Sequence, residues 1–462
     1  MQRLRLWLSL LLVGHCLVVP GLAAAVEPAP PVNIGTRLEL FVDAKLVDHM
    51  EGVEFYLHAP CRMPLPEHPL PVPYTTVLKD GDRYRAYYRD ILPGYDGERF
   101  DGHPGELTCY AESRDGHEWT FPDLGILDVK SSRGRNVILA GNGPETHNFT
   151  PFIDTRPGVD PEARYKALGG THPGGGLYAF QSADGLHWKK MQEAPVLTSE
   201  AFAFDSQNPS FWSVAEGRYV CFFRTWDTPH GELRTVSRSD SADFLHWSEP
   251  VPLNPNEPGE HIYTTATQPY FRAPHIYIAL PTRFFPDRGD STDIAFMSIR
   301  AGEDHYSRLF KEAFIRPGPD PERWGNRSNY VALNVVPTGP SEMSIYHKDG
   351  HRYVLRTDGF ISIRAGSEPG ELLTKPVIFT GSKLVLNVST SAGGSLRVEL
   401  QDADGRPLPG YGLEDNVPVI GDAIAREVEW TNSPDLSAIA GRPVRIRFVM
   451  TECDLYSFRF RE

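Results

Sequence analysis

Two carboxylates in the middle of the chain have surroundings that suit acid–base chemistry. Asp205 precedes the polar stretch 206–208, and Glu260 follows a Pro-Gly turn and precedes the stretch 261–263. Hydrolysis of a glycosidic bond uses one protonated and one ionised carboxyl group, placed on either side of that bond. The pair therefore predicts a glycoside hydrolase with a carbohydrate partner, in which Asp205 and Glu260 are the catalytic residues.

Other polar side chains recur at the same place in successive segments, where an apolar strand is expected to begin. A strand that only packed against its neighbours would not need them. We expect these side chains to surround the same opening and to bind substrate: His147, Asn148, Gln207, Asn208, Gln268, Arg327 and Asn329.

Three arginines stand where second strands are expected to end, at Arg89, Arg224 and Arg283. Guanidinium groups bind carboxylate or sulfate in a bidentate manner, so these residues predict an anionic sugar such as a uronate or a sulfated residue. Alternatively, the three arginines pair with Asp205, Glu260 and loop acids, because buried carboxylates require partners. The sequence leaves both interpretations open.

A repeated phrase indicates which elements position these residues. It is SRDGHEW at 113–119, SADGLHW at 182–188 and SADFLHW at 241–247, with a weaker echo, SIRAG, at 298–302 and 362–366. Turn residues and alternating apolar residues divide each repeat of about 60 residues into four strands. Five such units predict an all-β fold, a five-bladed β-propeller followed by a small C-terminal β-sandwich.

The phrase itself is expected to be structural rather than catalytic. Asp and Ser side chains satisfy turn amides, Gly accepts a positive φ, and Trp packs between blades. In a propeller the first strand of each blade runs away from one face and the second strand returns to it. The starts of first strands and the ends of second strands therefore meet at one mouth, where the candidate residues above would lie.

The chain is expected to divide into three parts: a signal peptide at 1–25, the propeller at 26–366 and the sandwich at 367–462. Arginines, a short apolar run and small residues begin the chain, as in a cleaved secretory signal, so we expect a secreted or periplasmic protein. The alternating segment 37–43 (RLELFVD) is expected to close the ring as an N-terminal strand. Asp43 and Glu342 are interpreted as structural.

Composition excludes several classes of function. With 46 basic and 60 acidic residues the formal net charge is −14, which disfavours nucleic acid and anionic lipid as partners. No membrane association is expected after signal cleavage. Cys109 and Cys221 lie in strands of different blades and are expected to be free thiols, and no motif indicates a metal site or another cofactor.

The sequence resembles the five-bladed-propeller glycoside hydrolases of families 32 and 43. The segment 204–209 (FDSQNP) resembles the inner strand that carries an Asp in a middle blade, and Glu260 resembles the Glu of the next blade. The resemblance implies that Asp205 stabilises the transition state or tunes the acid, that Glu260 donates the proton, and that Ca²⁺ could lie under the channel. It extends to uncharacterised exported proteins of the planctomycete type, labelled family-32-like by fold, and covers both propeller and sandwich.

The sequence departs from these families in the first blade. They carry a third acid on the first inner strand, whereas the corresponding stretch 74–78 (YTTVL) has none. A replacement would come from the following loop, which offers Asp90, Asp96, Glu98 and Asp101.

Two other functions compete with hydrolysis through paired carboxylates. One is a sialidase-like enzyme acting on anionic sugars, because the repeated phrase resembles the sialidase Asp box without its spacer residue. The other is a propeller that binds glycans without catalysis, which the missing acid favours.

Overall fold

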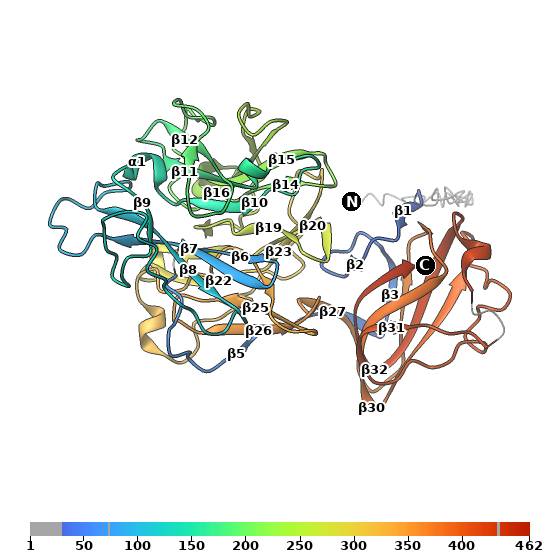
Figure 1. Ribbon diagram of the computed structural model, residues 1–462. Helices are drawn as coiled ribbons and strands as arrows, with labels where there is room; N and C mark the ends of the chain where they lie inside the picture. Colours follow the sequence, from blue (N-terminus) through green and yellow to red (C-terminus); the bar gives the residue numbers. More distant parts are fainter. Residues whose placement is uncertain (1–29, 73, 432–434) are drawn as a thin grey trace, which may run out of the picture.

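The computed structural model describes residues 30–72, 74–431 and 435–462, so the expected signal peptide at 1–25 lies outside the described residues. The described chain is almost entirely β-structure (Figure 1). Its helical segments are single turns: α1 (Gly143–Thr146), η1 (Pro161–Ala163), η2 (Pro286–Arg288), η3 (Pro321–Trp324) and η4 (Ser437–Ile439). None of the described helices has the length and apolar character needed to cross a membrane.

Three consecutive stretches of chain each form a four-stranded antiparallel sheet of neighbouring strands. Some of the connections are short turns that carry Gly, such as 81–82 and 214–217, whereas others are long loops, such as 114–136. The sheets are β6 (Thr76–Asp80), β7 (Arg83–Ile91), β8 (Glu106–Ser113) and β9 (Val137–Ala140); β10 (Thr150–Ile153), β11 (Tyr165–Thr171), β12 (Gly176–Ser182) and β13 (Lys189–Lys190); and β14 (Ser210–Ser213), β15 (Arg218–Thr228), β16 (Gly231–Ser241) and β17 (Val251–Pro252).

The fourth stretch is broken by a bend into two three-stranded sheets. These comprise β18 (His261–Ile262), β21 (Thr282–Phe285) and β22 (Ser291–Ile294), and β19 (Thr267–Tyr270), β20 (Ala273–Ala279) and β23 (Met297–Arg300). The fifth sheet contains β24 (Val336–Pro337), β25 (Glu342–Tyr346), β26 (Arg352–Arg356) and a strand from far upstream, β5 (Cys61–Arg62).

The first strands of these sheets lie next to one another. Strand β10 contacts both β6 and β14, β14 contacts β19, and β24 contacts β6. All five surround a cavity of about 540 Å³, lined in part by Val77, Phe152, Trp212, Phe271 and Val335. We count the two three-stranded sheets together as the fourth sheet and call the resulting five sheets the ring body.

The repeated phrase forms the same turn three times, as expected. In the first copy the Ser113 hydroxyl accepts from the Gly116 N–H at 2.9 Å, and Asp115 accepts from the His117 N–H at 2.7 Å. The turn of each sheet packs on the preceding sheet: the ring centroids of Trp119 and Tyr346 are 5.5 Å apart, and those of Trp188 and Tyr87 are 6.2 Å apart. The phrase therefore joins neighbouring sheets.

The ring closes through a different strand from the one that was expected. Within the segment 37–43 only β2 (Glu39–Leu40) is a strand, and it pairs with Phe458 and Ser457 outside the ring body. Strand β5 instead pairs with β26 and completes the fifth sheet. The reason is that Glu39 is fully buried beside Arg300, which holds the segment against the fourth sheet. Asp43 also binds Arg300, a structural role as expected.

The remaining strands form a second body beside the ring body (Figure 1). It combines upstream strands with the end of the chain: β1 (Val32–Gly35), β2, β3 (Val47–Glu51), β4 (Val53–Leu57), β27 (Ile361–Ala365), β28 (Gly370–Thr374), β29 (Val377–Phe379), β30 (Lys383–Gln401), β31 (Asp422–Glu427) and β32 (Pro443–Arg461). The echo at 362–366 belongs here, because β27 pairs with β4 and β32 rather than with the fifth sheet.

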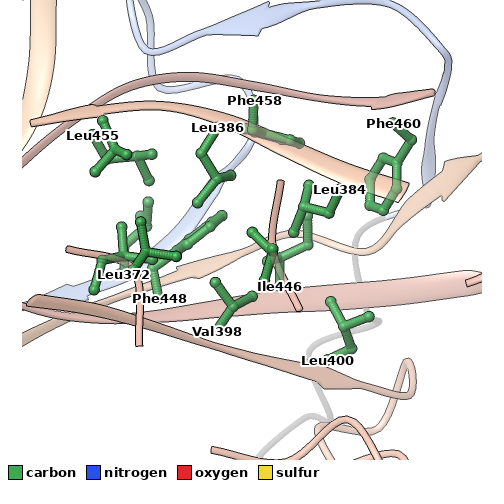
Figure 2. Packing of buried hydrophobic residues seen from close by; sticks show 14 of the residues in the cluster. Leu372, Leu384, Leu386, Val398, Leu400, Ile446, Phe448, Leu455, Phe458 and Phe460 are labelled. Carbon is green, nitrogen blue, oxygen red and sulfur yellow. The ribbon is translucent and has the colours of Figure 1, made fainter. Parts of the chain in front are cut away.

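The two 19-residue strands β30 and β32 supply half of the buried residues in the core of the second body. Figure 2 shows Leu384 and Phe458 on one side of this core, with Val398 and Phe448 facing them. All four side chains are fully buried. Each long strand therefore contributes to two layers.

Four cysteines lie in the described residues. Cys109 and Cys221, like Cys453, are buried, Cys61 is exposed, and none of these four forms a disulfide there.

Candidate active site

The segments that lead into the first strands meet at one end of the ring body. The Tyr74 and Tyr330 rings lie 5.8 Å apart, as do the Tyr263 and Tyr330 rings. The guanidinium of Arg89 lies 4.5 Å from the Tyr74 ring, and that of Arg224 lies 4.4 Å from the Tyr263 ring. We call this group the mouth cluster: Tyr74, Arg89, Asp205, Arg224, Arg234, Tyr263, Arg327 and Tyr330.

The backbone of these segments is strained. Tyr74 (φ 58°), Asn148 (φ 50°), Phe204 (φ 68°) and Arg327 (φ 52°) all have left-handed conformations, although none is glycine. Such residues cost roughly 1–3 kcal/mol each and occur preferentially at functional sites. The strain falls in or next to the mouth cluster.

Arg224 joins two members of the cluster. Its side chain is 2% exposed, and it pairs with both carboxylate oxygens of Asp205. It also donates to the Asp205 carbonyl and to the Tyr263 carbonyl, each at 2.8 Å. The Asp205 carboxylate therefore fixes Arg224 against Tyr263.

The three tyrosines of the mouth differ in acidity. Burial alone would raise the pKa of Tyr263, but the charge of Arg224 and a 3.1 Å hydrogen bond from Arg327 lower it below its usual value. Burial raises the pKa values of Tyr74 and Tyr330. The pKa of Tyr263 is thus shifted in the opposite direction from those of Tyr74 and Tyr330.

Glu260 does not face the mouth cluster. Side chains alternate along a strand, and in β18 His261 pairs with Phe284 while Ile262 pairs with Arg283. The Tyr263 ring packs on Phe284, whereas the Glu260 carboxylate contacts Arg283 on the other face. Asp205 shares Arg224 with Tyr263, so the expected arrangement of Asp205 and Glu260 across one pit is wrong.

Glu260 is instead held from several sides. Arg308 binds its two oxygens at 2.6 and 3.1 Å, Arg283 approaches to 3.3 Å, and the Glu257 N–H donates at 3.0 Å. The side chain is 4% exposed. This carboxylate is suited to an ion pair and has no free oxygen with which to protonate a sugar.

The three expected arginines are all occupied by acids. Arg224 pairs with Asp205, Arg283 pairs with Glu260 and Asp293, and Arg89 lies 3.7 Å from Glu106. The interpretation that they hold the site together therefore describes their contacts better than direct binding of an anion.

Glu106 is the carboxylate that the first sheet contributes, and sequence reasoning missed it. Its Oε2 lies 2.8 Å from His147 Nδ1, and Arg89 donates to the side-chain Oδ1 of Asn148 at 3.2 Å. Burial would raise the pKa of Glu106, but His147 and Arg89 lower it. The expected loop acids differ: the Asp90 carboxylate accepts from Ser132, Asp101 lies 3.7 Å from His147, and Asp96 and Glu98 are exposed.

A simple geometric signal would have found Glu106 and Arg234. Third strands start at the same end of a sheet as second strands finish, because the two run antiparallel. Glu106 begins β8, and Arg234 lies near the start of β16. The expectation considered only first and second strands.

The remaining expected residues are buried amides that connect strands. Gln207 donates to Thr76 at 3.1 Å, and Gln268 accepts from the Val335 N–H at 2.8 Å. Asn208 donates to the Ser206 carbonyl, and Asn329 donates to the Thr292 carbonyl. These contacts stabilise the inner strands.

The residues around the central cavity do not fit the Ca²⁺ that the resemblance implies. Ca²⁺ takes six to eight oxygen ligands, often carboxylates. Asp80, the acid that lines the cavity, is held by Arg85, Arg164 and Tyr165. Within the described ranges, three metal-type ligands come together at His49, Glu51 and Glu371, on strands β3 and β28 of the second body.

Solved structures show a limited similarity to the chain. A thermostable family-43 glycoside hydrolase is 15% identical, with a TM-score of 0.42, covering 66% of this chain and 92% of its own. The family-32 β-fructofuranosidase of Bombyx mori is 10% identical, with a TM-score of 0.39 and coverage of 91% and 95%. An N-acetylgalactosamine deacetylase from F. plautii is 13% identical, with a TM-score of 0.40 and coverage of 92% and 94%.

No protein-family model matches the sequence, and no curated protein matches it. With TM-scores below 0.5, the function of the chain has to be argued from its own site.

Proposed function

We propose that the five sheets of the ring body are the blades of a propeller, that the second body is a sandwich, and that the mouth cluster hydrolyses a glycosidic bond. Contacts between neighbouring first strands, and turns that pack on the preceding sheet, support the ring.

We also propose that the chain is exported and loses residues 1–25. Sequencing the N-terminus of the exported protein tests this.

One observation carries the proposed chemistry: the Tyr263 phenol lies between the guanidiniums of Arg224 and Arg327. Tyrosine acts as the nucleophile in one class of glycosidases. Neighbouring groups whose pKa values are pushed apart are candidates for the acid and base roles. Tyr263 is the ionisable member, and Tyr74, which is partly exposed, is the protonated member.

The proposed reaction has two steps. Tyr263 reacts as the phenolate, after its proton has passed to solvent: its oxygen bonds to the anomeric carbon as the glycosidic C–O bond breaks, and the leaving oxygen takes a proton from Tyr74. Water then attacks the anomeric carbon, its proton returns to Tyr74, and the bond to Tyr263 breaks. Asp205 has a positioning role, because it fixes Arg224 beneath Tyr263.

Replacing Tyr263 by Phe tests the nucleophile. We expect kcat/KM on aryl glycosides to fall by about 10³-fold or more, because a nucleophile is not replaced by the remaining groups. The matched control is Tyr178→Phe, which removes a hydroxyl that binds the Gly174 carbonyl in the second sheet. A 2-fluoro glycoside should label the peptide that contains Tyr263, as measured by mass spectrometry. Unchanged turnover in Tyr263→Phe, with no label, would exclude the proposal.

The pH profile gives a second test. Because the charge and hydrogen bond of Arg327 lower the pKa of Tyr263, Arg327→Gln should raise that pKa. The rising limb of kcat/KM should then move to higher pH, while Arg218→Gln, which breaks an exposed pair with Asp240, should leave it in place. A rising limb that does not move in Arg327→Gln contradicts ionisation of Tyr263.

A glycan-binding propeller without catalysis is the second candidate. It is favoured because Asp205, the carboxylate in the mouth cluster, is already fully paired with Arg224. In that case purified protein would bind immobilised glycans and release no product from any aryl glycoside or polysaccharide, and Tyr263→Phe would bind as well as the original protein.

A further inference from the structure

The mouth cluster carries more positive than negative charge. Arg224 is neutralised by Asp205, but among the side chains that the structure describes no carboxylate lies within 4 Å of Arg234, Arg327 or the nearby Lys348. Arg327 donates to Asn326 and to Tyr263, and Lys348 donates to the Arg327 carbonyl. Unpaired cations gathered in one place are unexpected in a chain with a formal charge of −14.

Arg234 is held in a fixed orientation with free hydrogen-bonding capacity. Its guanidinium packs on three rings, 4.2 Å from Trp226, 5.0 Å from Phe284 and 5.2 Å from Tyr263. One Nη lies 3.4 Å from His261 Nδ1, but the buried Nε has no hydrogen-bond partner among the described side chains. Stacking of this kind preorganises a guanidinium for bidentate binding, and an unpaired buried donor is costly until a ligand accepts from it.

The cations act on one another. Burial and the charge of Arg224 lower the pKa of Arg234, and burial together with Arg327 lowers the pKa of Lys348. The pKa of His261 is lowered by burial and by Arg234 and Arg224. The positive groups facing the mouth are therefore destabilised in the free protein, and a bound anion would relieve this.

We propose that Arg234 and Arg327 bind the acidic group of an anionic sugar, a carboxylate or a sulfate ester, at the mouth cluster. This inference rests on the proposed function and names its substrate class. Anion binding is thereby assigned not to Arg89, Arg224 and Arg283, which acids neutralise, but to two arginines that have no acidic partner among the described side chains. Of the rings around Arg234, that of Trp226 is partly exposed and offers an apolar surface for the sugar ring.

The test separates binding from turnover. In the inactive Tyr263→Phe background, calorimetry measures the affinity for glucuronate, galacturonate, a sugar sulfate, the matching neutral sugars and inorganic sulfate. We expect at least one anionic sugar to bind about tenfold or more tightly than its neutral counterpart. Adding Arg234→Gln or Arg327→Gln should remove that difference, while Arg218→Gln should keep it. Melting temperatures show which variants fold. Because Arg327 is exposed, its replacement is expected to disturb the fold less than that of Arg234.

The panel of ligands identifies the anion and distinguishes an anionic sugar from a neutral sugar and from inorganic sulfate. Preference for uronates or for the sugar sulfate assigns the acidic group, and the affinity should fall with rising salt because the attraction is electrostatic. Equal affinity for neutral and acidic sugars, or binding of inorganic sulfate alone, would overturn the inference. If anionic sugars bind but the original protein releases no product from aryl uronides, the proposed hydrolysis fails and the inference stands.

Discussion

At the scale of single residues, the role of a carboxylate depends on which face of a short strand it occupies. The sequence correctly places polar groups where strands begin, yet Glu260 and Tyr263 point to opposite faces of the same segment. A shift of one residue reverses every side chain in a strand. The two-residue strand β18 pairs with Phe284 and Arg283, which are more than 20 positions further along the chain. The sequence alone therefore does not indicate on which face of the strand Glu260 lies.

Replacing Glu260 by Gln should therefore affect stability rather than chemistry. Removing one partner of a buried ion pair costs roughly 3–5 kcal/mol, because the other charges are left uncompensated. Here both Arg308 and Arg283 would lose their acid. We expect a lower denaturation midpoint, with kcat of the folded fraction within about twofold of the original value. Glu303→Gln, which removes an exposed pair with Lys45, is the control. A large fall in kcat without loss of stability would restore Glu260 as a proton donor.

At the scale of elements, the repeated phrase was the best predictor of the fold. Its turn chemistry is local, so Ser, Asp and Gly in order suffice to specify it. The strand that closes the fifth sheet was not predictable in this way, because the pairing of Cys61–Arg62 with β26 depends on residues almost 300 positions apart. Local signals specify turns and strands, whereas long-range pairing decides which strands become neighbours.

The third copy of the phrase offers a test of packing against backbone strain. Phe244 replaces Gly and has φ 74°, yet its buried ring packs 5.5 Å from Phe152 and 5.1 Å from Tyr219. Phe244→Gly relieves about 1–2 kcal/mol of strain but removes a core ring worth roughly 3–5 kcal/mol. We expect a net loss of stability in denaturant unfolding, whereas Gly217→Ala, at an open turn, should cost less. A more stable Phe244→Gly variant would show that strain outweighs packing.

At the scale of the whole molecule, the ring body and the second body share buried charges. Glu39, next to β32, pairs with Arg300 of the fourth sheet at 2.8 Å and contacts His275 at 3.2 Å. Asp358 likewise binds Tyr270 of the ring body at 2.7 Å and Ser457 of the second body at 2.7 Å. We therefore expect the two bodies to unfold together.

The shared charges predict how stability varies with pH. Burial would raise the pKa of Glu39, but His275 and Arg300 lower it below its usual value. Its contribution is therefore complete above the pKa of an unfolded Glu, about 4.3, and is lost as the pH falls through the lower native pKa. We expect Glu39→Gln to be less stable than the original protein at pH 7 and to approach it near pH 3, as measured by thermal unfolding. A constant difference between pH 7 and pH 3 would contradict this linkage.

The mixed origin of the second body also affects how the chain is made. Strands β1 to β4 leave the ribosome about 400 residues before the end of β32. Strand β2 pairs directly with β32, whereas β1 and β3 pair with β29 and β28, which in turn pair with β32. At 5–20 residues per second, synthesis of that interval takes roughly 20–80 s. The early strands have to wait, with their edges exposed, while the ring body assembles. A chaperone bound to these strands would protect the nascent chain from aggregation during this time, as would a delay in strand formation.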